Sequence, residues 1–250
     1  MKWNTFPVDV AFTRQETPAI LHLGLRRADG EPFQFQAGQF INLHFDRAGQ
    51  PAHRSYSVAN APGDSDVFEI AMSPVEGGLA TSALTAARPG DRLTASGPYG
   101  RFVLKDDPPC RLVLVGTGTG ITPYRAMLPE LAARVAGGGF RVHVLLGVWR
   151  RDETLFGADF LAAREKYGIG FTACYSRDYP DCPEPWEHRG YVQTAFDDLS
   201  LHPESDIVYL CGNPGMVDAA AEWLKEREFG TRQAVSYTHL TLPTTLNSCR

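Results

Sequence analysis

Residues 111–123 read RLVLVGTGTGITP, and this segment decides the fold. Its first five residues are mostly apolar and predict a buried strand. Glycine then stands at alternate positions, and a helical stretch follows at 124–135. A strand that turns through glycines into a helix is typical of an α/β unit.

The glycine loop is chemically suited to phosphate. Its glycines allow a tight turn and a close approach of the backbone to a ligand. The start of the next helix offers free N–H donors and the positive end of its dipole to a pyrophosphate. Ile121 stands where the common dinucleotide fingerprint has its third glycine, so a turn that is glycine-rich only for packing remains an alternative. The candidate cofactor-binding residues are Gly116, Thr117, Gly118, Thr119, Gly120, Thr122 and Pro123.

The rest of the second half repeats the alternation of strand and helix. Apolar runs at 142–148, 171–175 and 206–210 predict strands of a mostly parallel sheet. The last run leads into a second loop and then a helix at 217–227. Open α/β sheets bind ligands at the carboxyl ends of their strands, so the two loops should face one crevice. In the second loop we take Gly212, Asn213 and Pro214 as candidate cofactor-binding residues.

Cys211 precedes these residues and would stand at the mouth of the crevice. A thiol there could touch a reacting ring, which makes Cys211 a candidate catalytic group. Cysteine is often only a small buried hydrophobe, and that interpretation stays open.

The first half has a different pattern, with short β-prone segments separated by turns. Closely spaced strands of this kind predict an antiparallel barrel or sandwich. A helix at 79–87 interrupts them and ends before Pro89-Gly90. The expected strands are 8–13, 20–25, 40–45, 53–58, 67–72 and 91–95. With a linker at 106–109, the sequence predicts a β-barrel domain at 1–106 and an α/β nucleotide-binding domain at 107–234.

Composition narrows the chemistry. The chain has 250 residues, of which 43% are hydrophobic, and its net charge of −5 gives no general attraction to nucleic acid. It contains no signal-peptide core and no apolar stretch of membrane-spanning length, so we expect a soluble, cytoplasmic protein. Its five cysteines show no CxxC spacing, which argues against a disulfide framework and against a metal site. Any redox chemistry must then come from an organic cofactor.

Three motifs together resemble the ferredoxin–NADP⁺ reductase superfamily over residues 6–233. They are Arg54-Ser55-Tyr56-Ser57, the glycine loop at 116–123, and Cys211-Gly212-Asn213-Pro214, in the family's order. The resemblance implies FAD in the first domain and a nicotinamide dinucleotide in the second. It also implies hydride transfer from the nicotinamide to the flavin, followed by one-electron steps.

The resemblance also gives the flavin motif its roles. Arg54 would pair with a flavin phosphate, Tyr56 would stack on the isoalloxazine, and Ser57 would hydrogen-bond near the reactive N5, which makes Ser57 a candidate catalytic group. Read without the family, this segment is an ordinary exposed strand. A glycine turn and hydroxyl groups at the next helix start suit a second pyrophosphate, although a well-capped helix explains them too. The candidates there are Gly78, Ala80, Thr81 and Ser82.

The choice between NADP and NAD depends on the strand end at 176–177. Ser176 and Arg177 resemble the pair with which NADP-dependent members hold the 2′-phosphate, and Arg150 adds a second cation. Asp178 and Asp181 keep NAD possible, because a carboxylate can bind the ribose diol. The sequence favours NADPH.

The resemblance suggests ferredoxin or flavodoxin as the electron partner, with basic residues near the flavin edge. The sequence does not determine the oligomeric state, for which we expect a monomer. Two alternatives remain: the reductase component of an oxygenase system, and a non-catalytic electron-transfer subunit or flavin-based sensor.

The last segment, 235–250, has neither helical nor strand patterning that fits the second domain. We assign it to neither domain and expect it to be non-native, with the natural C-terminus missing.

Overall fold

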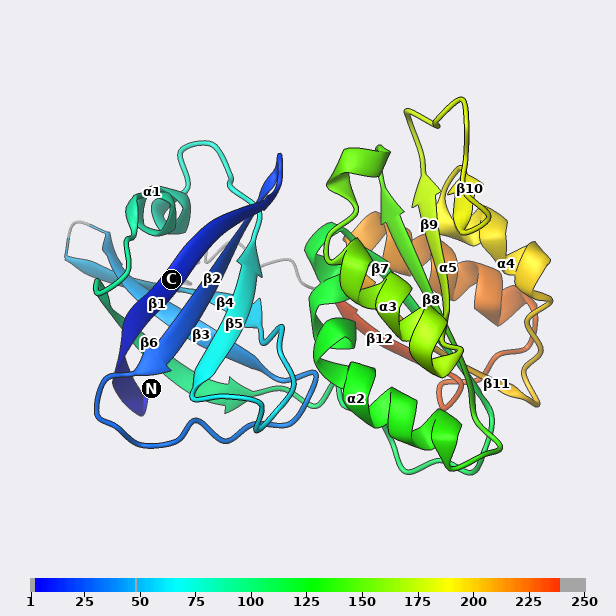
Figure 1. Ribbon diagram of the computed structural model, residues 1–250, viewed down its shortest axis with the longest axis horizontal. Coiled ribbons are helices and arrows are strands. Elements are labelled where there is room, and N and C mark those ends of the chain that lie inside the picture. Colours follow the sequence, from blue (N-terminus) through cyan, green and yellow to red (C-terminus); the bar gives the residue numbers. More distant parts are fainter. Residues whose placement is uncertain (1–2, 48, 239–250) are drawn as a thin grey trace, which may run out of the picture.

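The computed structural model describes residues 3–47 and 49–238, which form two six-stranded sheets side by side (Figure 1). The first sheet is antiparallel, with the order β4-β3-β6-β1-β2-β5. A bridge between Val58 and Ile70 joins the segment after β4 to β5, so the two edges of the sheet approach each other. The elements are β1 (Thr5–Thr17), β2 (Ile20–Arg27), β3 (Phe40–Arg47), β4 (Gln50–Ser57), β5 (Val67–Met72), α1 (Leu79–Ala86) and β6 (Arg92–Tyr99).

Alternation of side chains explains this barrel. Phe6, Val8 and Val10 of β1 are buried in one apolar cluster, while the residues between them are more exposed. A strand with a period of two places these side chains on one face, and that face packs inward. The predicted antiparallel barrel is confirmed.

The second sheet is parallel, with the order β10-β9-β8-β7-β11-β12. Its strands are β7 (Arg111–Thr117), β8 (Arg141–Val148), β9 (Gly170–Tyr175), β10 (Glu187–Arg189), β11 (Asp206–Gly212) and β12 (Ala234–Thr238). Its helices are α2 (Thr122–Ala136), α3 (Gly157–Tyr167), α4 (Ala195–Leu199) and α5 (Pro214–Glu226), with short 3₁₀ turns at Gly118–Ile121, Arg151–Glu153 and Val192–Thr194. The predicted parallel α/β architecture is confirmed.

Both faces of this sheet are covered (Figure 1). Leu112 and Leu114 of β7 pack in the cluster that includes α2 and α3, whereas Val113 and Val115 pack in the cluster of α4 and α5. Strands covered on both faces read as continuous apolar runs, which is why no polar alternation marks them in the sequence.

The strand order reverses at β7. The chain runs from β7 outward through β8, β9 and β10, and then returns to place β11 on the other side of β7. Cys211 of β11 is in register with Gly116 of β7, so the loops after these two strands are neighbours. This reversal is the switch point at which open α/β sheets bind ligands.

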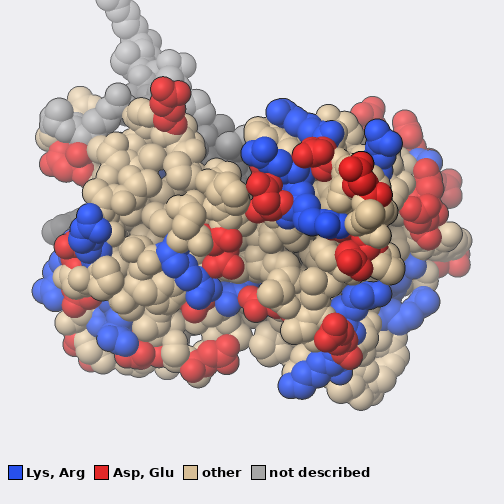
Figure 2. Space-filling view, turned by 45° about the horizontal axis from the view of Figure 1, so that its top comes forward, with Lys and Arg blue, Asp and Glu red and all other residues tan. Residues whose placement is uncertain are grey.

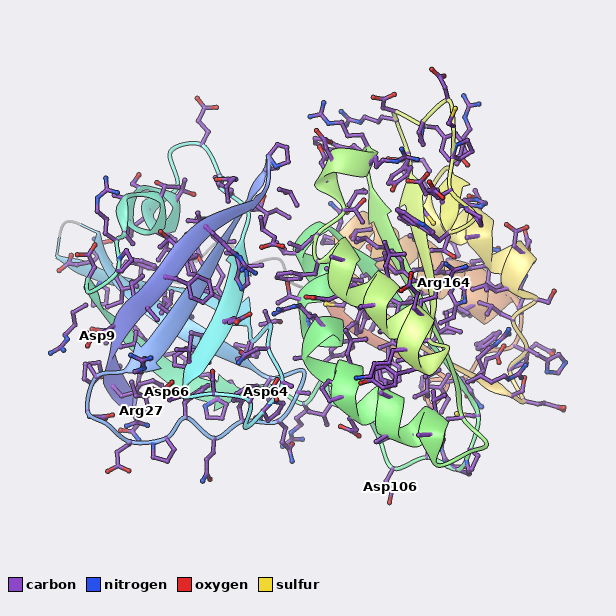
Figure 3. The ribbon with its side chains drawn as sticks, viewed as in Figure 1. Asp9, Arg27, Asp64, Asp66, Asp106 and Arg164 are labelled. Carbon is purple, nitrogen blue, oxygen red and sulfur yellow. The ribbon has the colours of Figure 1, made fainter. Side chains whose placement is uncertain are left out.

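Apolar side chains join the barrel to the second sheet. The cluster that contains α2 and α3 also contains five barrel-side residues, namely Ile20, Ala37, Ala59, Ala71 and Phe102. Asp106, in the connection between the sheets, projects away from the molecule beyond the end of α2 (Figure 3). Within the described ranges, no helix is long and apolar enough to cross a membrane.

The C-terminal segment differs in part from the expectation. Residues 235–238 complete strand β12, which pairs in parallel with β11, although their sequence has no strand pattern that fits the domain. Backbone groups at an open sheet edge can pair with any extended segment, and such pairing needs no characteristic side-chain pattern. The remainder of the expected tail, 239–250, lies outside the described residues.

Candidate active site

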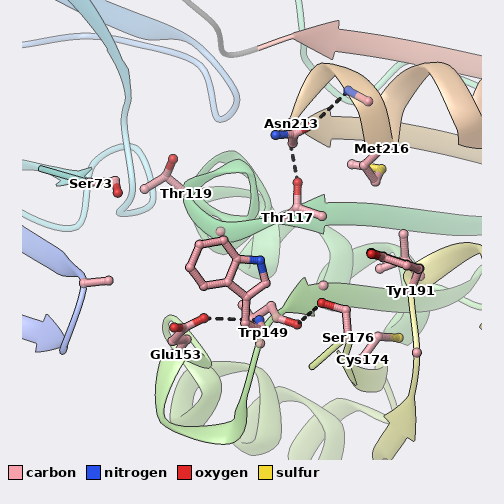
Figure 4. Close-up of a pocket in the computed structure, with 18 of the residues that line it drawn as sticks. Ser73, Thr117, Thr119, Trp149, Glu153, Cys174, Ser176, Tyr191, Asn213 and Met216 are labelled. Atoms are coloured by element: carbon pink, nitrogen blue, oxygen red, sulfur yellow. Dashed lines mark hydrogen bonds between the residues drawn. The ribbon is translucent and has the colours of Figure 1, made fainter. Parts of the chain in front are cut away.

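Two cavities lie at the junction of the two sheets. The larger has a volume of about 1010 Å³ and the smaller of about 310 Å³. Ser73, Val75 and Thr119 line both, so the cavities adjoin. Ser73 of the barrel side and Thr119 of the glycine loop reach toward the same space (Figure 4).

The larger cavity lies against the carboxyl ends of the parallel strands. Both predicted loops contribute to it, which places the glycine loop and the loop after β11 in one crevice. Of the predicted site residues, it is lined by Thr117, Gly118, Thr119, Ser176, Gly212 and Asn213. Pro214 begins α5, and the side chain of Asn213 caps that helix by accepting a 2.8 Å hydrogen bond from the N–H of Gly215.

Two glycines of the loop are required for different reasons. Gly118 has φ +52°, and a Cβ added there would meet nothing within 4 Å, so its backbone faces open space. A Cβ on Gly120 would lie 2.2 Å from the carbonyl oxygen of Cys211. Gly118 therefore leaves room for a ligand, and Gly120 allows the loop to pack on β11.

The predicted cations Arg150 and Arg177 lie next to residues that line the larger cavity, namely Trp149 and Ser176. The guanidinium carbon of Arg177 lies 3.9 Å from the centre of the Trp149 ring, and Trp149 lines the cavity. Arg177 forms no ion pair with any described residue, whereas Arg150 is paired with Asp152 and Glu153 at 3.2 and 3.3 Å. Arg177 is thus the cation that remains free to bind an anion.

Neither arginine lines the cavity wall; Ser176 does. Asp178 and Asp181 line neither cavity.

The smaller cavity brings the flavin motif together with the start of α1. Within it, Thr119 and Thr122 of the glycine loop face the motif from the second sheet. The predicted site residues that line this cavity are Arg54, Tyr56, Ser57, Gly78, Ala80, Thr81, Thr119 and Thr122. Ser82 does not line it; its hydroxyl donates to the carbonyl of Gly78 at 3.3 Å.

Charge in the smaller cavity favours an anion. Arg54 donates to the carbonyl of His53 at 2.8 Å and forms no ion pair with the described residues. Burial raises the pKa of Tyr56 to about 12, against the opposing effect of Arg54. Tyr56 is therefore an uncharged ring beside an unneutralised guanidinium, which suits an aromatic group that carries a phosphate.

Among the described residues, three buried side-chain oxygen atoms lack a hydrogen-bond partner; one is Oδ2 of Asp107 in the connection between the sheets, and the other two belong to residues that line the cavities. These two are Oγ1 of Thr122 and Oε1 of Gln193, and their residues line the smaller and the larger cavity respectively. Buried polar atoms in native proteins normally have partners, so each of these fits a ligand group. The cavities accordingly fit a flavin nucleotide and a dinucleotide.

Gln193 and its neighbour Tyr191 were missed by the sequence analysis. Tyr191 is 69% exposed and lines the larger cavity. Both follow β10 as the other loops follow their strands, and this position was the signal that could have identified them.

Cys211 is not placed as expected. It is fully buried, lines neither cavity, and packs in the cluster with Tyr124, so its thiol faces the core and not the mouth of the crevice. Burial also raises the pKa of this thiol. Cys174 of β9 lines the larger cavity instead, and burial raises its pKa to about 12.

Comparison with known proteins agrees with this geometry. Residues 12–104 match the family model for an oxidoreductase FAD-binding domain, and residues 114–222 match the model for an oxidoreductase NAD-binding domain. The chain is 33% identical over 225 residues to ferredoxin–NADP reductase B of Sorangium cellulosum, an alignment that covers 87% of this chain and 90% of that protein. The chain belongs to the ferredoxin–NADP reductase family. It is an FAD-dependent NAD(P)H oxidoreductase.

Other relatives of the family are parts of oxygenase systems. The chain is 33% identical to the toluate 1,2-dioxygenase electron transfer component of Pseudomonas putida, over 86% of this chain and 62% of that protein. It is 32% identical to the reductase component of a phenol 2-monooxygenase of Pseudomonas sp., over 82% of this chain and 57% of that protein. The chain therefore spans less than two thirds of these relatives.

Solved structures agree in fold. The Amycolatopsis cytochrome P450 reductase GcoB superposes with a TM-score of 0.83 at 27% identity, covering 94% of this chain and 70% of that one. A Neisseria gonorrhoeae ferredoxin NADP⁺ reductase with bound FAD and NADP gives a TM-score of 0.81 at 22% identity. The superposition covers 96% of this chain and 100% of that one.

Proposed function

We propose that this protein transfers electrons between NADPH and ferredoxin or flavodoxin through FAD. The observation that carries the proposal is the adjacency of the two cavities at Ser73, Val75 and Thr119. The bound cofactors supply the chemistry, which is hydride transfer from nicotinamide to flavin and release of single electrons. The residues of the chain orient the two rings against each other and exclude water from their contact.

The residues of the smaller cavity would hold the flavin. Arg54 would pair with a phosphate, Tyr56 would stack on the ring system, and Ser57 would supply a hydroxyl group near N5. The start of α1, residues 78–82, offers backbone N–H groups to the phosphates. Thr122 supplies a hydroxyl group whose oxygen has no hydrogen-bond partner in the part of the chain that the structure describes.

The residues of the larger cavity would hold the dinucleotide. The glycine loop, 116–123, would hold the pyrophosphate with its backbone N–H groups and the start of α2. Gly212 and Asn213 line the opposite wall and would lie beside the nicotinamide half, and Pro214 follows them at the start of α5. Cys211 is left out of this assignment because its thiol is buried elsewhere.

The preference for NADPH rests on Arg177 and Ser176. A guanidinium that is held by Trp149 and has no acidic partner among the described residues is suited to a 2′-phosphate. Arg150 lies nearby but is already paired with two carboxylates. NAD remains the second nucleotide that this site can take.

Ferredoxin is the acceptor favoured by the name of the relative from Sorangium cellulosum, whose length the chain nearly spans, and we retain flavodoxin beside it as part of the proposal. The second candidate is a reductase component of an oxygenase system, favoured by the relatives named as such. On the face shown in Figure 2, basic side chains are interspersed with acidic ones, so this face has no large patch of one sign. We also place the domain boundary between 106 and 107, in the exposed connection.

Anaerobic reduction of the purified protein tests the proposal. Yellow protein with bound FAD should bleach on addition of NADPH, and more slowly with NADH. Reduced protein should then reduce added ferredoxin or flavodoxin. Protein that takes up no flavin, or that neither nucleotide bleaches, would refute the proposed function. Bleaching by NADH alone, without reduction of ferredoxin or flavodoxin, would favour the oxygenase reductase.

A further inference from the structure

The guanidinium of Arg125 joins the two halves of the molecule. Nη1 donates to Oε2 of Glu69 at 2.6 Å and to the carbonyl of Ala59 at 3.1 Å, both on the barrel side. Nε donates to Oδ2 of Asp159 on α3 at 2.5 Å. Among residues 3–47 and 49–238, Arg125–Glu69 is the only ion pair that crosses from residues before 107 to residues after 106.

The contacts of Arg125 join segments that adjoin the two cofactor motifs. Arg125 lies in the first turn of α2, two residues after Pro123 of the glycine loop. Ala59 lies two residues after Ser57 of the flavin motif, and its N–H donates to the carbonyl of Glu69 at 2.7 Å. One side chain thus ties the start of the dinucleotide helix to the end of the flavin strand.

The ion pair is charged and largely shielded from solvent. The side chains of Arg125 and Glu69 are 17% and 21% exposed. Burial would raise the pKa of Glu69, but hydrogen bonds from His22 and Arg125 lower it to about 2. Removal of one partner leaves the other charge buried without compensation, so this contact holds its geometry more firmly than a surface pair does.

Phe156 and His22 complete the packing around this pair. The guanidinium lies 4.4 Å from the centre of the Phe156 ring, and the His22 ring meets the same ring edge-on at 5.1 Å. Phe156 has φ +55°, an unusual conformation for a bulky side chain. Such backbone persists only where the surroundings determine it, which marks this junction as closely specified.

We propose that Arg125 is a positioning residue that fixes the dinucleotide loop against the flavin strand at the spacing needed for hydride transfer. This inference rests on the proposed function. Reacting atoms must approach to about 3–3.5 Å, and a shift of about 1 Å can slow a reaction about 100-fold. Arg125 lines neither cavity, so it acts on the spacing of the motifs and not on the affinity of either cofactor.

The test is anaerobic rapid mixing of the FAD-loaded protein with increasing NADPH or NADH. In Arg125→Gln we expect the limiting rate of flavin bleaching to fall about 10- to 100-fold. The half-saturating nucleotide concentration, the FAD content and reduction by dithionite should remain at their wild-type values. Arg125→Lys retains the charge and one donor group and should recover part of the rate.

Arg134→Gln is the matched control. Arg134 is also 17% exposed, lies on the same helix, and donates to a glutamate and a backbone carbonyl, those of Glu130 and Lys105. Its loss should leave the limiting rate unchanged. The proposal would be overturned if the limiting rate of Arg125→Gln equalled that of the wild type, or if only the half-saturating nucleotide concentration changed. It would also be overturned if Arg134→Gln lost as much of the limiting rate as Arg125→Gln.

If Arg125→Gln does not retain FAD, the limiting rates of Arg125→Lys and Glu69→Gln test the inference instead. Both should bleach more slowly than the wild type at saturation, and wild-type limiting rates in both would overturn the inference. Failure of the wild type to bleach with either nucleotide would overturn the proposed function, and this inference with it.

Discussion

The hydroxyl of Thr117 accepts a 2.9 Å hydrogen bond from the backbone N–H of Asn213. This bond joins the glycine loop after β7 to the loop after β11, across the switch point of the sheet (Figure 4). A Cβ on Gly212 would lie 2.2 Å from the same hydroxyl oxygen, so glycine is required beside it. One side chain therefore bonds the two walls of the larger cavity to each other, in addition to the pairing of β7 with β11.

Thr117→Val should weaken dinucleotide binding. Valine has nearly the same shape but leaves the N–H of Asn213 without its acceptor, at a cost of about 1 kcal/mol, so the Kd for NADP⁺ should rise about five- to tenfold. Calorimetric titration of the oxidised protein measures this. Thr172→Val is the control, because it removes a hydroxyl bonded to His143 at 2.9 Å, away from both cavities. Equal Kd values for Thr117→Val and the wild type would contradict the prediction.

Gly118→Ala should retain FAD and lose dinucleotide. The added methyl meets no protein atom, but it occupies the open side of the loop, and φ +52° costs a non-glycine residue about 1–2 kcal/mol. We expect NADP⁺ affinity to fall at least about tenfold.

Gly63→Ala is the control for the backbone penalty, since Gly63 also has positive φ and open space around its Cβ position. It should lose similar stability and no affinity. Gly120→Ala should instead impair folding, because its Cβ would meet the carbonyl of Cys211 at 2.2 Å. Unchanged NADP⁺ binding in Gly118→Ala would show that the ligand does not approach this loop.

Arg177→Gln should change nucleotide selectivity. A charge-assisted contact with a 2′-phosphate is worth about 1.5–3 kcal/mol, so kcat/KM for NADPH should fall about 10- to 100-fold, while kcat/KM for NADH stays the same. Steady-state reduction of a dye acceptor measures both. Arg150→Gln should have the smaller effect, because Arg150 is already paired with Asp152 and Glu153. An equal loss with both nucleotides would point to a structural role for Arg177.

The architecture could be predicted because its signals are local. The glycine loop at 116–123 lies on the end of an apolar strand, and the alternation in β1 marks one buried face, so both sheets follow from patterns within about ten residues. The structure also brings Arg54 and Thr122, 68 residues apart, to one cavity, because the two motifs lie at facing ends of their sheets.

The remaining features depend on contacts that no local pattern encodes. Whether Cys211 faces the cavity or the core depends on the register of β11, and a shift of one residue reverses it. Arg125 stands on an amphipathic helix like any solvated arginine, and its partner Glu69 is 56 residues away. Strand β12 has no buried residue among those whose burial is described, so its pairing with β11 leaves little trace in its composition.

Folding stability should decrease between pH 6.5 and pH 4 because of His143. Burial, with smaller effects of Arg111 and Arg164, lowers the pKa of His143 to about 4 from an ordinary value of 6.5. The unfolded chain therefore takes up this proton at a higher pH than the folded chain. The contribution of the neutral His143 side chain to the free energy of unfolding is fully present above pH 6.5. It is lost as the pH falls to 4, and the loss amounts to about 3 kcal/mol.

Urea unfolding at several pH values tests this expectation in the wild type and in His143→Gln. The variant has no titrating group at this position, so its stability should fall less over the same interval. Thr172→Val keeps the buried imidazole under Gly170, whose Cβ would lie 2.3 Å from Nδ1, and should keep the wild-type pH dependence. Parallel profiles of the wild type and His143→Gln between pH 6.5 and 4 would mean that other groups cause the loss of stability.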